Sequence, residues 1–407
     1  MTLLRVLRCG TACLCAASLL AQDGISGALR TVDGRTLSGT LVVDADGKAT
    51  LTNATGNTAL PVDEFATFEP TGVVAERLEA PHRLWLRSGG ELPVVKFSGA
   101  PAKDGKPARV VVETSSRLQL EFPLATVRAL RQGGLERPEP RLFRDDLAKP
   151  AANDDLLYVV QGGKQQRSSV QVTGVRADGV DFLLRDEAYE FDLKGVAAVV
   201  FGANTGLAPD RQGRPRTRLE LRRGEVFEGR LLGLDANTVR CRLDEGVEVE
   251  VPGNQLLRLS VQSDRLAWLG DLPAKVTQTP AFDRTWEPTY DKSLGGPGFR
   301  IGGAVFARGI GLVPRTRLDY ELGGRFDVFE AVIGIDDRGG PEAHAVFRVL
   351  VDGVVAFESA AKTRGLPPEP IRVPLQKAQR FAIEVDFGKN FDLGDHCVFA
   401  DARVLQQ

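Results

Sequence analysis

Histidine is scarce in this 407-residue sequence: only His82, His344 and His396 are present, and Met1 is the single methionine. Three imidazoles leave little room for His-rich metal sites or for several His-based catalytic centres. Neither sign of charge is in excess, since 52 Lys and Arg face 54 Asp and Glu, a net charge of −2. This balance argues against a general electrostatic binder of nucleic acid, so no nucleic-acid partner is expected.

Catalytic signatures are also missing. The sequence has no nucleophile elbow, no phosphate-binding loop, no His-Glu-x-x-His and no Cys-x-x-Cys beyond residue 21. Asp and Glu are plentiful, which leaves a carboxylate-pair glycosidase open on composition alone. A (β/α)₈ barrel needs about 250 residues of alternating strands and helices, and the repeats described below leave no room for it. The sequence therefore predicts a protein that is not an enzyme.

The sequence has no long apolar run, and its one notable apolar stretch, near the amino terminus, is short. Residues 1–21 place Arg5 and Arg8 before a small, apolar stretch from Cys9 to Leu20, and Ala21 follows. This order is typical of a secretory signal peptide, and the run is short for a membrane span; an uncleaved anchor is the alternative. We expect a periplasmic or extracellular protein, with no stable membrane insertion once the signal is removed.

Cysteine becomes rare once the signal is removed. Only Cys241 and Cys397 remain, and both lie in strand-like stretches. An exported protein could join them in a disulfide. Because the two residues fall in different predicted domains, buried free thiols are the preferred interpretation.

Glycine and proline are abundant, with 44 and 23 residues spread along the chain, which indicates many turns and short strands. A pattern of alternating strand, Gly-containing turn, second strand, polar turn and further short strands recurs four times. Each copy has about 45 residues and about four strands, too few to bury much alone, so strongly curled sheets or pairing between copies is needed. The copies loosely resemble Sm-like or SH3-like small barrels. The predicted β-units are 24–75, 80–131, 155–202 and 217–263, with exposed linkers at 132–154 and 203–216.

The last third of the sequence, residues 264–407, has longer and more aromatic strands. The stretch Phe326–Ile335 alternates so that Phe329, Ala331 and Ile333 share one face. Seven or eight such strands in about 140 residues predict a β-sandwich. The fold class is therefore all-β: tandem small β-barrel or meander units followed by a C-terminal sandwich of jelly-roll type.

An ordered set of motifs in this region resembles a known family. Residues 265–406 are similar to the NPCBM family, a carbohydrate-binding module with a galactose-binding-like jelly-roll fold. The matching motifs are Leu266–Leu272, Gly302–Gly311, Leu318–Gly324, Gly334–Asp337, Phe347–Val349, Asp352–Gly353, Asp395–His396 and Ala400–Ala402. Two positions differ from the family, which usually has His where this chain has Val313 and Trp where it has Phe399. These differences remove a polar group and an aromatic platform.

Six polar residues are candidates for the binding site, each with a structural alternative. Asp336 and Asp337 could bind Ca²⁺ through their oxygens or cap a turn. Asp395 and His396 lie in a predicted loop at a sandwich end, where ligands bind, or form an Asx turn beside an exposed His. Arg348 and Glu358 lie on neighbouring predicted strands. They could hydrogen-bond to sugar hydroxyls or form a cross-strand ion pair.

Aromatic residues could add a stacking surface for a sugar, although Trp268, Trp286 and Tyr290 are expected to pack at the sandwich edge. The function predicted from the sequence is that of an exported, non-catalytic protein. Its array of β-units presents a sandwich that binds a glycan or a cell-envelope polysaccharide. The alternative is a structural or protein–protein interaction module of the envelope that binds no sugar. No cofactor is expected apart from a structural Ca²⁺ ion.

Overall fold

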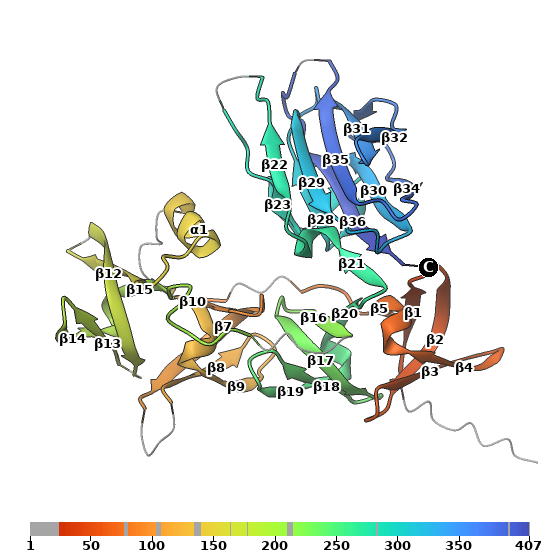
Figure 1. The fold of residues 1–407 in the computed structure, drawn as a ribbon. Coiled ribbons are helices and arrows are strands. Elements are labelled where there is room, and N and C mark those ends of the chain that lie inside the picture. Colours follow the sequence, from red (N-terminus) through yellow and green to blue (C-terminus); the bar gives the residue numbers. More distant parts are fainter. Residues whose placement is uncertain are drawn as a thin grey trace, which may run out of the picture.

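The computed structural model describes residues 24–406 except 77–79, 103–106, 134–139, 163, 177, 210–214, 282–283 and 390. This part of the chain contains 36 β-strands and a single α-helix, so the all-β prediction is confirmed (Figure 1). The predicted signal, residues 1–21, lies outside the described residues. No helix among those described is long and apolar enough to span a membrane.

The first two thirds of the chain fold as four units of five strands each, one more than the sequence predicted. A short 3₁₀ turn separates the fourth strand from the fifth in every unit. The strands of unit 1 are β1 (Ile25–Thr31), β2 (Thr36–Val43), β3 (Lys48–Asn53), β4 (Gly56–Pro61) and β5 (Phe65–Pro70). Those of unit 2 are β6 (His82–Leu86), β7 (Glu91–Ala100), β8 (Arg109–Thr114), β9 (Gln119–Pro123) and β10 (Val127–Arg131).

Units 3 and 4 repeat this plan. Unit 3 holds β11 (Asp155–Gln161), β12 (Lys164–Val175), β13 (Gly179–Leu184), β14 (Glu187–Asp192) and β15 (Val196–Val200). Unit 4 holds β16 (Arg216–Leu221), β17 (Val226–Leu234), β18 (Thr238–Leu243), β19 (Glu248–Pro252) and β20 (Leu256–Gln262). Positive-φ glycines such as Gly34 and Gly224 make the first hairpins of units 1 and 4, as the alternating strands on either side of them predict.

Strand pairing between the units does not follow their order along the chain. The last strands of units 1 and 4 pair through Leu259 and Phe68, and those of units 2 and 3 pair through Ala129 and Val200. Units 4 and 2 meet where Val226 on β17 pairs with Glu91 on β7. The spatial order is therefore 1–4–2–3, as Figure 1 shows from the red unit to the yellow-green one. Each unit thus gains buried surface that it could not supply alone.

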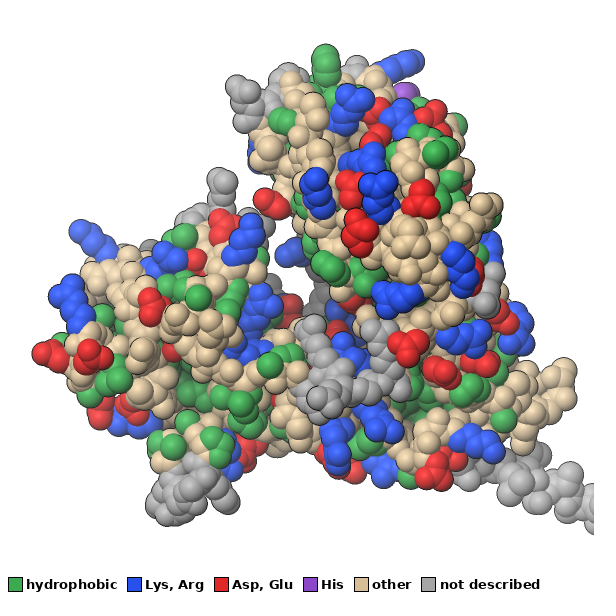
Figure 2. All heavy atoms as spheres, viewed as in Figure 1, with side chains coloured by type: hydrophobic (Ala, Val, Ile, Leu, Met, Phe, Trp, Pro, Cys, Tyr) green, Lys and Arg blue, Asp and Glu red, His purple; other side chains and the backbone are tan. Residues whose placement is uncertain are grey.

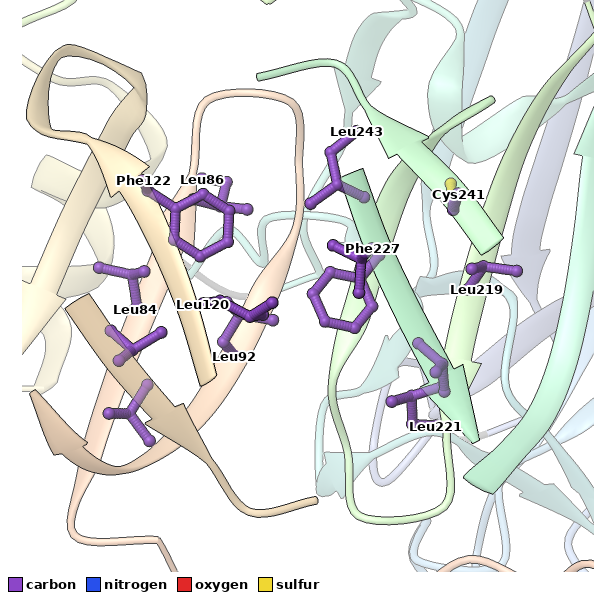
Figure 3. Close-up of a cluster of buried hydrophobic side chains, with 14 of the residues drawn as sticks. Leu84, Leu86, Leu92, Leu120, Phe122, Leu219, Leu221, Phe227, Cys241 and Leu243 are labelled. Carbon is purple, nitrogen blue, oxygen red and sulfur yellow. The ribbon is translucent and has the colours of Figure 1, made fainter. Parts of the chain in front are cut away.

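One hydrophobic cluster runs through all four units. Figure 3 shows the side chains of unit 2, among them Leu84 and Phe122, beside those of unit 4, among them Leu219 and Phe227. A buried carboxylate also joins these two units, because Glu225 accepts hydrogen bonds from the amide (2.6 Å) and the hydroxyl (2.9 Å) of Ser116. Units 2 and 4 therefore form one continuous core rather than separate domains on a string.

The prediction of an exposed linker at 132–154 is wrong in part. The helix α1 (Pro140–Ala148) forms there, and its Phe143 is 5% exposed. Phe143 packs against Trp85 of unit 2 and Tyr158 of unit 3, at ring-centroid distances of 5.6 and 5.9 Å. Leu147 packs against the same cluster, and Asp146 accepts a hydrogen bond from the Tyr158 hydroxyl, so apolar and polar contacts together dock the helix where two units meet.

The linker predicted at 203–216 is also held in place at its start. The Arg87 side chain of unit 2 donates hydrogen bonds to the carbonyls of Gly202 (2.8 Å), Ala203 (3.1 Å) and Ala125 (3.1 Å). The backbone of Ala203 also donates to Ala151, in the preceding linker, at 2.7 Å. The Arg87 guanidinium and the Leu207 amide, which donates to the Ala125 carbonyl at 2.8 Å, thus tie this connection to unit 2, which its polar composition did not reveal.

The C-terminal region is a two-sheet sandwich, as predicted. One sheet has the strand order β23 (Thr289–Tyr290), β28 (Gly309–Leu312), β36 (Cys397–Leu405), β30 (Val328–Ile335) and β34 (Glu369–Pro374), with β21 (Leu266–Trp268) also paired to β36. The other has the order β22 (Lys275–Gln278), β29 (Thr316–Glu321), β35 (Arg380–Phe387), β31 (His344–Val351) and β32 (Val354–Glu358), with β33 (Lys362–Thr363) paired to β31. Two small hairpins complete it: β24 (Lys292–Ser293) with β25 (Gly296–Pro297), and β26 (Phe299–Ile301) with β27 (Ala304–Phe306).

The sandwich is docked on units 1 and 4 through an apolar contact. Val32 and Ala66 of unit 1 form one buried cluster with Leu266, Trp268 and Leu405 of the sandwich. The Trp268 indole also donates a hydrogen bond to the Val261 carbonyl of unit 4, at 3.1 Å.

Ion pairs surround this contact. They join Arg30 to Glu330 (3.5 Å) and Arg218 to Asp291 (3.4 Å). The orientation of the sandwich is thereby fixed by both units.

Candidate functional site

The end of the sandwich that lies away from the β-units gathers the loops with the predicted site residues. Strand β36 runs from this end, at Cys397, to the docked end, at Leu405. Cys397 is paired with Leu312 on β28 and with Ile335 on β30, so the residues that follow those two strands meet there. We call this end the free end; its described residues are 279–281, 284–288, 313–315, 336–343, 388–389 and 391–396, and it is uppermost in Figure 1.

Asp336 and Asp337 cap turns. Asp336 is fully buried and accepts hydrogen bonds from the amide of Arg300 (3.0 Å) and from the amide and Nε of Arg338 (2.9 and 2.7 Å). Arg338 and the two amides hold the pKa of Asp336 below its usual range, against the effect of burial. Asp337 accepts from the amides of Gly302 (2.8 Å) and Gly303 (2.9 Å). Both carboxylates thus fix the loops of the free end.

Metal ligands are not grouped in the described part of the chain. No set of three or more His, Cys, Asp or Glu side chains there is placed to hold a metal ion. The expected Ca²⁺ ion stays a prediction, and the turn-capping contacts of Asp336 and Asp337 occupy the oxygens that it would use.

Asp395 and His396 lie in the adjacent loop. Asp395 is 1% exposed and accepts a hydrogen bond from the amide of His344 at 2.7 Å, while its Oδ2 has no hydrogen-bond partner among the described residues. Burial raises the pKa of Asp395 to about 6 and lowers that of His396. His396 is half-buried, and its Nδ1 is equally unpartnered within the described chain. Asp395 therefore anchors the start of β31 rather than presenting its oxygens to solvent.

Arg348 and Glu358 form a cross-strand ion pair on the outer face of the second sheet. Arg348 Nε lies 2.5 Å from Glu358, and its Nη1 lies 3.0 Å from Glu384 and also contacts Asp386. These three carboxylates raise the pKa of Arg348. Figure 2 shows basic and acidic side chains interspersed over the visible face of the sandwich, which fits such pairs. The structure thus divides the six predicted residues between this face and the free end.

A hollow at the free end brings together residues that the sequence did not connect. It is shallow and open to solvent, with about 160 Å³ of free space that includes the open mouth, and it is lined by Gln278, Pro280, Arg284, Thr285, Trp286, Val313, Pro314, Arg315 and Thr316. Gln278 Nε2 donates to the Thr316 hydroxyl at 3.0 Å and to the Trp286 carbonyl, which fixes one wall. The Arg284 guanidinium carbon lies 3.7 Å from the centre of the Trp286 ring. Trp286 therefore stands at a concave surface, whereas the sequence favoured edge packing over a stacking role for it.

The two positions that differ from the family have different environments. Val313 is 6% exposed and lines the hollow, so the missing polar group would have stood beside Trp286. Phe399 is fully buried and packs edge-on against Phe347, with ring centroids 5.2 Å apart. The expectation that Phe399 replaces an aromatic platform is therefore wrong, because a side chain in the sandwich core cannot stack on a ligand. Position 313 and Trp286 were the two sequence signals that fall in the hollow.

Comparisons with known proteins find similarity to carbohydrate-related proteins. A relative from Renibacterium salmoninarum, provisionally named an endo-alpha-N-acetylgalactosaminidase, is 34% identical over 90 residues, which is 22% of this chain and only 6% of the relative.

Among solved structures, the CBM51-2 and INT domains of Clostridium perfringens ZmpB, in complex with GlcNAc, are 21% identical. The TM-score is 0.32, and the match covers 42% of this chain and 38% of the ZmpB chain. CBM51 of Clostridium perfringens GH95, in complex with methyl-galactose, is 23% identical and has a TM-score of 0.31. The match covers 34% of this chain and 99% of that structure. Residues 265–405, which include both sheets of the sandwich, match the family model of the NPCBM/NEW2 domain, as the motifs in the sequence predicted.

Proposed function

We propose that this chain is an exported, non-catalytic carbohydrate-binding protein whose glycan site is the hollow at the free end of the sandwich. The observation that carries the proposal is Trp286, an aromatic side chain in a concave surface of a domain that matches NPCBM/NEW2. Aromatic rings offer a large, rigid contact area with little entropic cost of ordering, and pockets combine such walls with a few placed polar groups. Gln278 and Thr316 supply polar groups, and Val313 and Pro314 supply an apolar floor.

The chemistry of the lining supports binding without catalysis. The nine described residues of the hollow include no carboxylate, imidazole or thiol. Glycoside hydrolysis in most families uses two carboxylates about 5 to 9.5 Å apart, one of them a proton donor. The hollow can therefore orient a sugar but offers no group to cleave it.

Glycan binding by the chain produced without residues 1–21 tests the proposal. A glycan array should give specific binding, and Trp286→Ala should weaken it about thirtyfold, which corresponds to about 2 kcal/mol for losing a buried aromatic anchor. Tyr189→Ala is the matched control, because Tyr189 is an exposed aromatic residue (42%) of unit 3, far from the sandwich. Silence across the array, or equal losses in the two variants, would refute the proposed site.

A structural role without sugar binding is the second candidate, favoured by one observation. In the described structure, β14 pairs only with β13 and leaves its other edge open at the end of the array, with Glu187–Glu190 exposed. Open edges are templates for pairing with another chain. Concentration-dependent self-association in light scattering, abolished by a proline at Ala188, would support this role.

A further inference from the structure

Two cationic side chains stand among the described residues that line the hollow. Arg284 and Arg315 both line it, and none of the nine described lining residues is Asp or Glu. From this and the geometry below, we infer that the hollow selects glycans bearing an anionic group, a carboxylate or a sulfate, over neutral ones. The inference rests on the proposed function, since it names the class of sugar that the same site takes.

The Arg284 side chain is held against an aromatic ring, a contact that uses none of its N–H donors. Its guanidinium carbon is 3.7 Å from the centre of the Trp286 ring, close enough for a cation–π contact that fixes the orientation of the group. In the described part of the chain, no carboxylate lies within 4 Å of it, and it makes no hydrogen bond to those residues. A guanidinium has five N–H donors in a planar fork that fits the two oxygens of a carboxylate. Arg284 is therefore pre-organised for an acceptor that none of the described residues supplies.

The positive charge of Arg315, the second cation in the lining, is only partly neutralised by a neighbouring carboxylate. Its Nε lies 3.1 Å from Asp386, and its side chain remains 51% exposed. Asp386 also contacts Arg348, so its negative charge is shared between two guanidinium groups. The further acids of that network, Glu358 and Glu384, contact Arg348 and do not line the hollow. Arg315 can thus present N–H donors to a ligand in the hollow while Asp386 fixes its stem.

The balance of donors and acceptors leads to the same ligand class. A neutral sugar is rich in hydroxyl groups, each of which needs an acceptor for its proton as well as a donor. The hollow offers two guanidinium groups as donors, whereas its side-chain acceptors are limited to Gln278 and two threonine hydroxyls, and one of those hydroxyls already accepts from Gln278. A ligand that brings its own acceptors, such as a uronate or a sulfated sugar, fits this lining better.

A matched pair of ligands tests the inference. Calorimetric titration of the chain without residues 1–21 compares oligogalacturonate with its fully methyl-esterified form, which keeps the ring and loses the charge; a sulfated oligosaccharide and its desulfated form make a second pair. We expect the acid of at least one pair to bind at least tenfold more tightly than its neutral form. We also expect this preference to fall as salt rises, because screening weakens exposed charge contacts.

Variants test whether the two arginines of the lining, rather than positive charge anywhere on the sandwich, bind the acid. Arg284→Gln and Arg315→Gln should each weaken binding of the acid about tenfold more than they weaken binding of the neutral form, so that the preference for the acid shrinks in both variants. Arg317→Gln is the control, because Arg317 lies on the adjacent β29, pairs with Asp319 at 2.7 Å and does not line the hollow. Circular dichroism spectra identical to that of the wild type establish that each variant is folded.

The outcomes distinguish this inference from the proposed function. Equal or tighter binding of the neutral forms, lost in Trp286→Ala, overturns the anionic preference and leaves carbohydrate binding intact. Acid binding that Arg317→Gln weakens as much as Arg284→Gln overturns the role of the hollow. Absence of binding to any glycan, charged or neutral, overturns both.

Discussion

The buried carboxylate of Glu330 provides the sharpest test of what holds the sandwich together. Glu330 is 6% exposed and accepts from Arg403, itself 2% exposed, and from Arg372, with Arg30 of unit 1 at 3.5 Å. Glu330→Ala leaves the Arg403 guanidinium buried without its counter-ion. Removing one partner of a buried pair costs about 3–5 kcal/mol, because the remaining charge is desolvated and unpaired.

This free energy gives a measurable change in melting temperature. At roughly 3 °C per kcal/mol for a domain of about 150 residues, Glu330→Ala should lower the melting transition of the sandwich by about 9–15 °C in scanning calorimetry. Glu358→Ala is the matched control, because Glu358 pairs with Arg348 in the same domain but is 54% exposed. Exposed pairs contribute about 0–1 kcal/mol, so the control should shift by about 3 °C or less.

A double variant identifies the cause of the loss. Arg403→Met in the Glu330→Ala background removes the unpaired charge and should restore part of the stability, because an apolar replacement of a whole buried pair is often neutral. Equal shifts in Glu330→Ala and Glu358→Ala would refute the reasoning, since burial would then not decide the strength of these pairs. A double variant less stable than Glu330→Ala would show that Arg403 acts mainly by packing on Trp268.

Three further predictions follow from individual groups. Burial raises the pKa of Asp395 from 3.8 to about 6, so the buried carboxylate costs stability at pH 7, and this cost falls progressively between those two pH values. Asp395→Asn should therefore exceed the wild type in urea resistance at pH 7 and lose most of that advantage at pH 4.5, whereas an equal difference at both pH values would contradict it. Arg87→Ala should release residues 203–209 and make them the first site of limited proteolysis; an unchanged digestion pattern would count against the tie. Cys241 and Cys397 are buried free thiols, and burial raises the pKa of Cys241 to about 12, so both should react with a thiol reagent only after denaturation; rapid labelling of the native chain would disprove this.

Much of the fold followed from local patterns. Period-two alternation and paired turn residues mark the hairpins of the β-units, as at Gly34 and Gly224, where positive φ requires glycine. The long aromatic strands of the sandwich were also predictable, since β31 alternates half-buried and buried residues along most of its length and β30 is buried at every position but one. The helix α1 was not, because its docking depends on Phe143 finding a partner ring in each of two units.

The candidate site was only partly predictable. The sequence located the loops of the free end, and Asp336, Asp337, Asp395 and His396 do lie there. The hollow lies beside them because Trp286 and Arg315 are brought together by the pairing of β22 with β29, at Gln278 and Thr316. Arg348 and Glu358, placed on neighbouring strands by the sequence, turned out to neutralise each other.

The repeated hairpins and the ordered motifs after residue 264 were enough to predict an all-β chain with an NPCBM-like sandwich in its last third. Alternation and turn chemistry act over a few residues, which is why they can be read from the sequence. Tertiary structure alone decided the nested 1–4–2–3 pairing, the docking of the sandwich through Trp268, and the hollow around Trp286. Each of these depends on contacts between residues far apart in the chain, and the free energy of burying those surfaces leaves no periodic trace in the sequence.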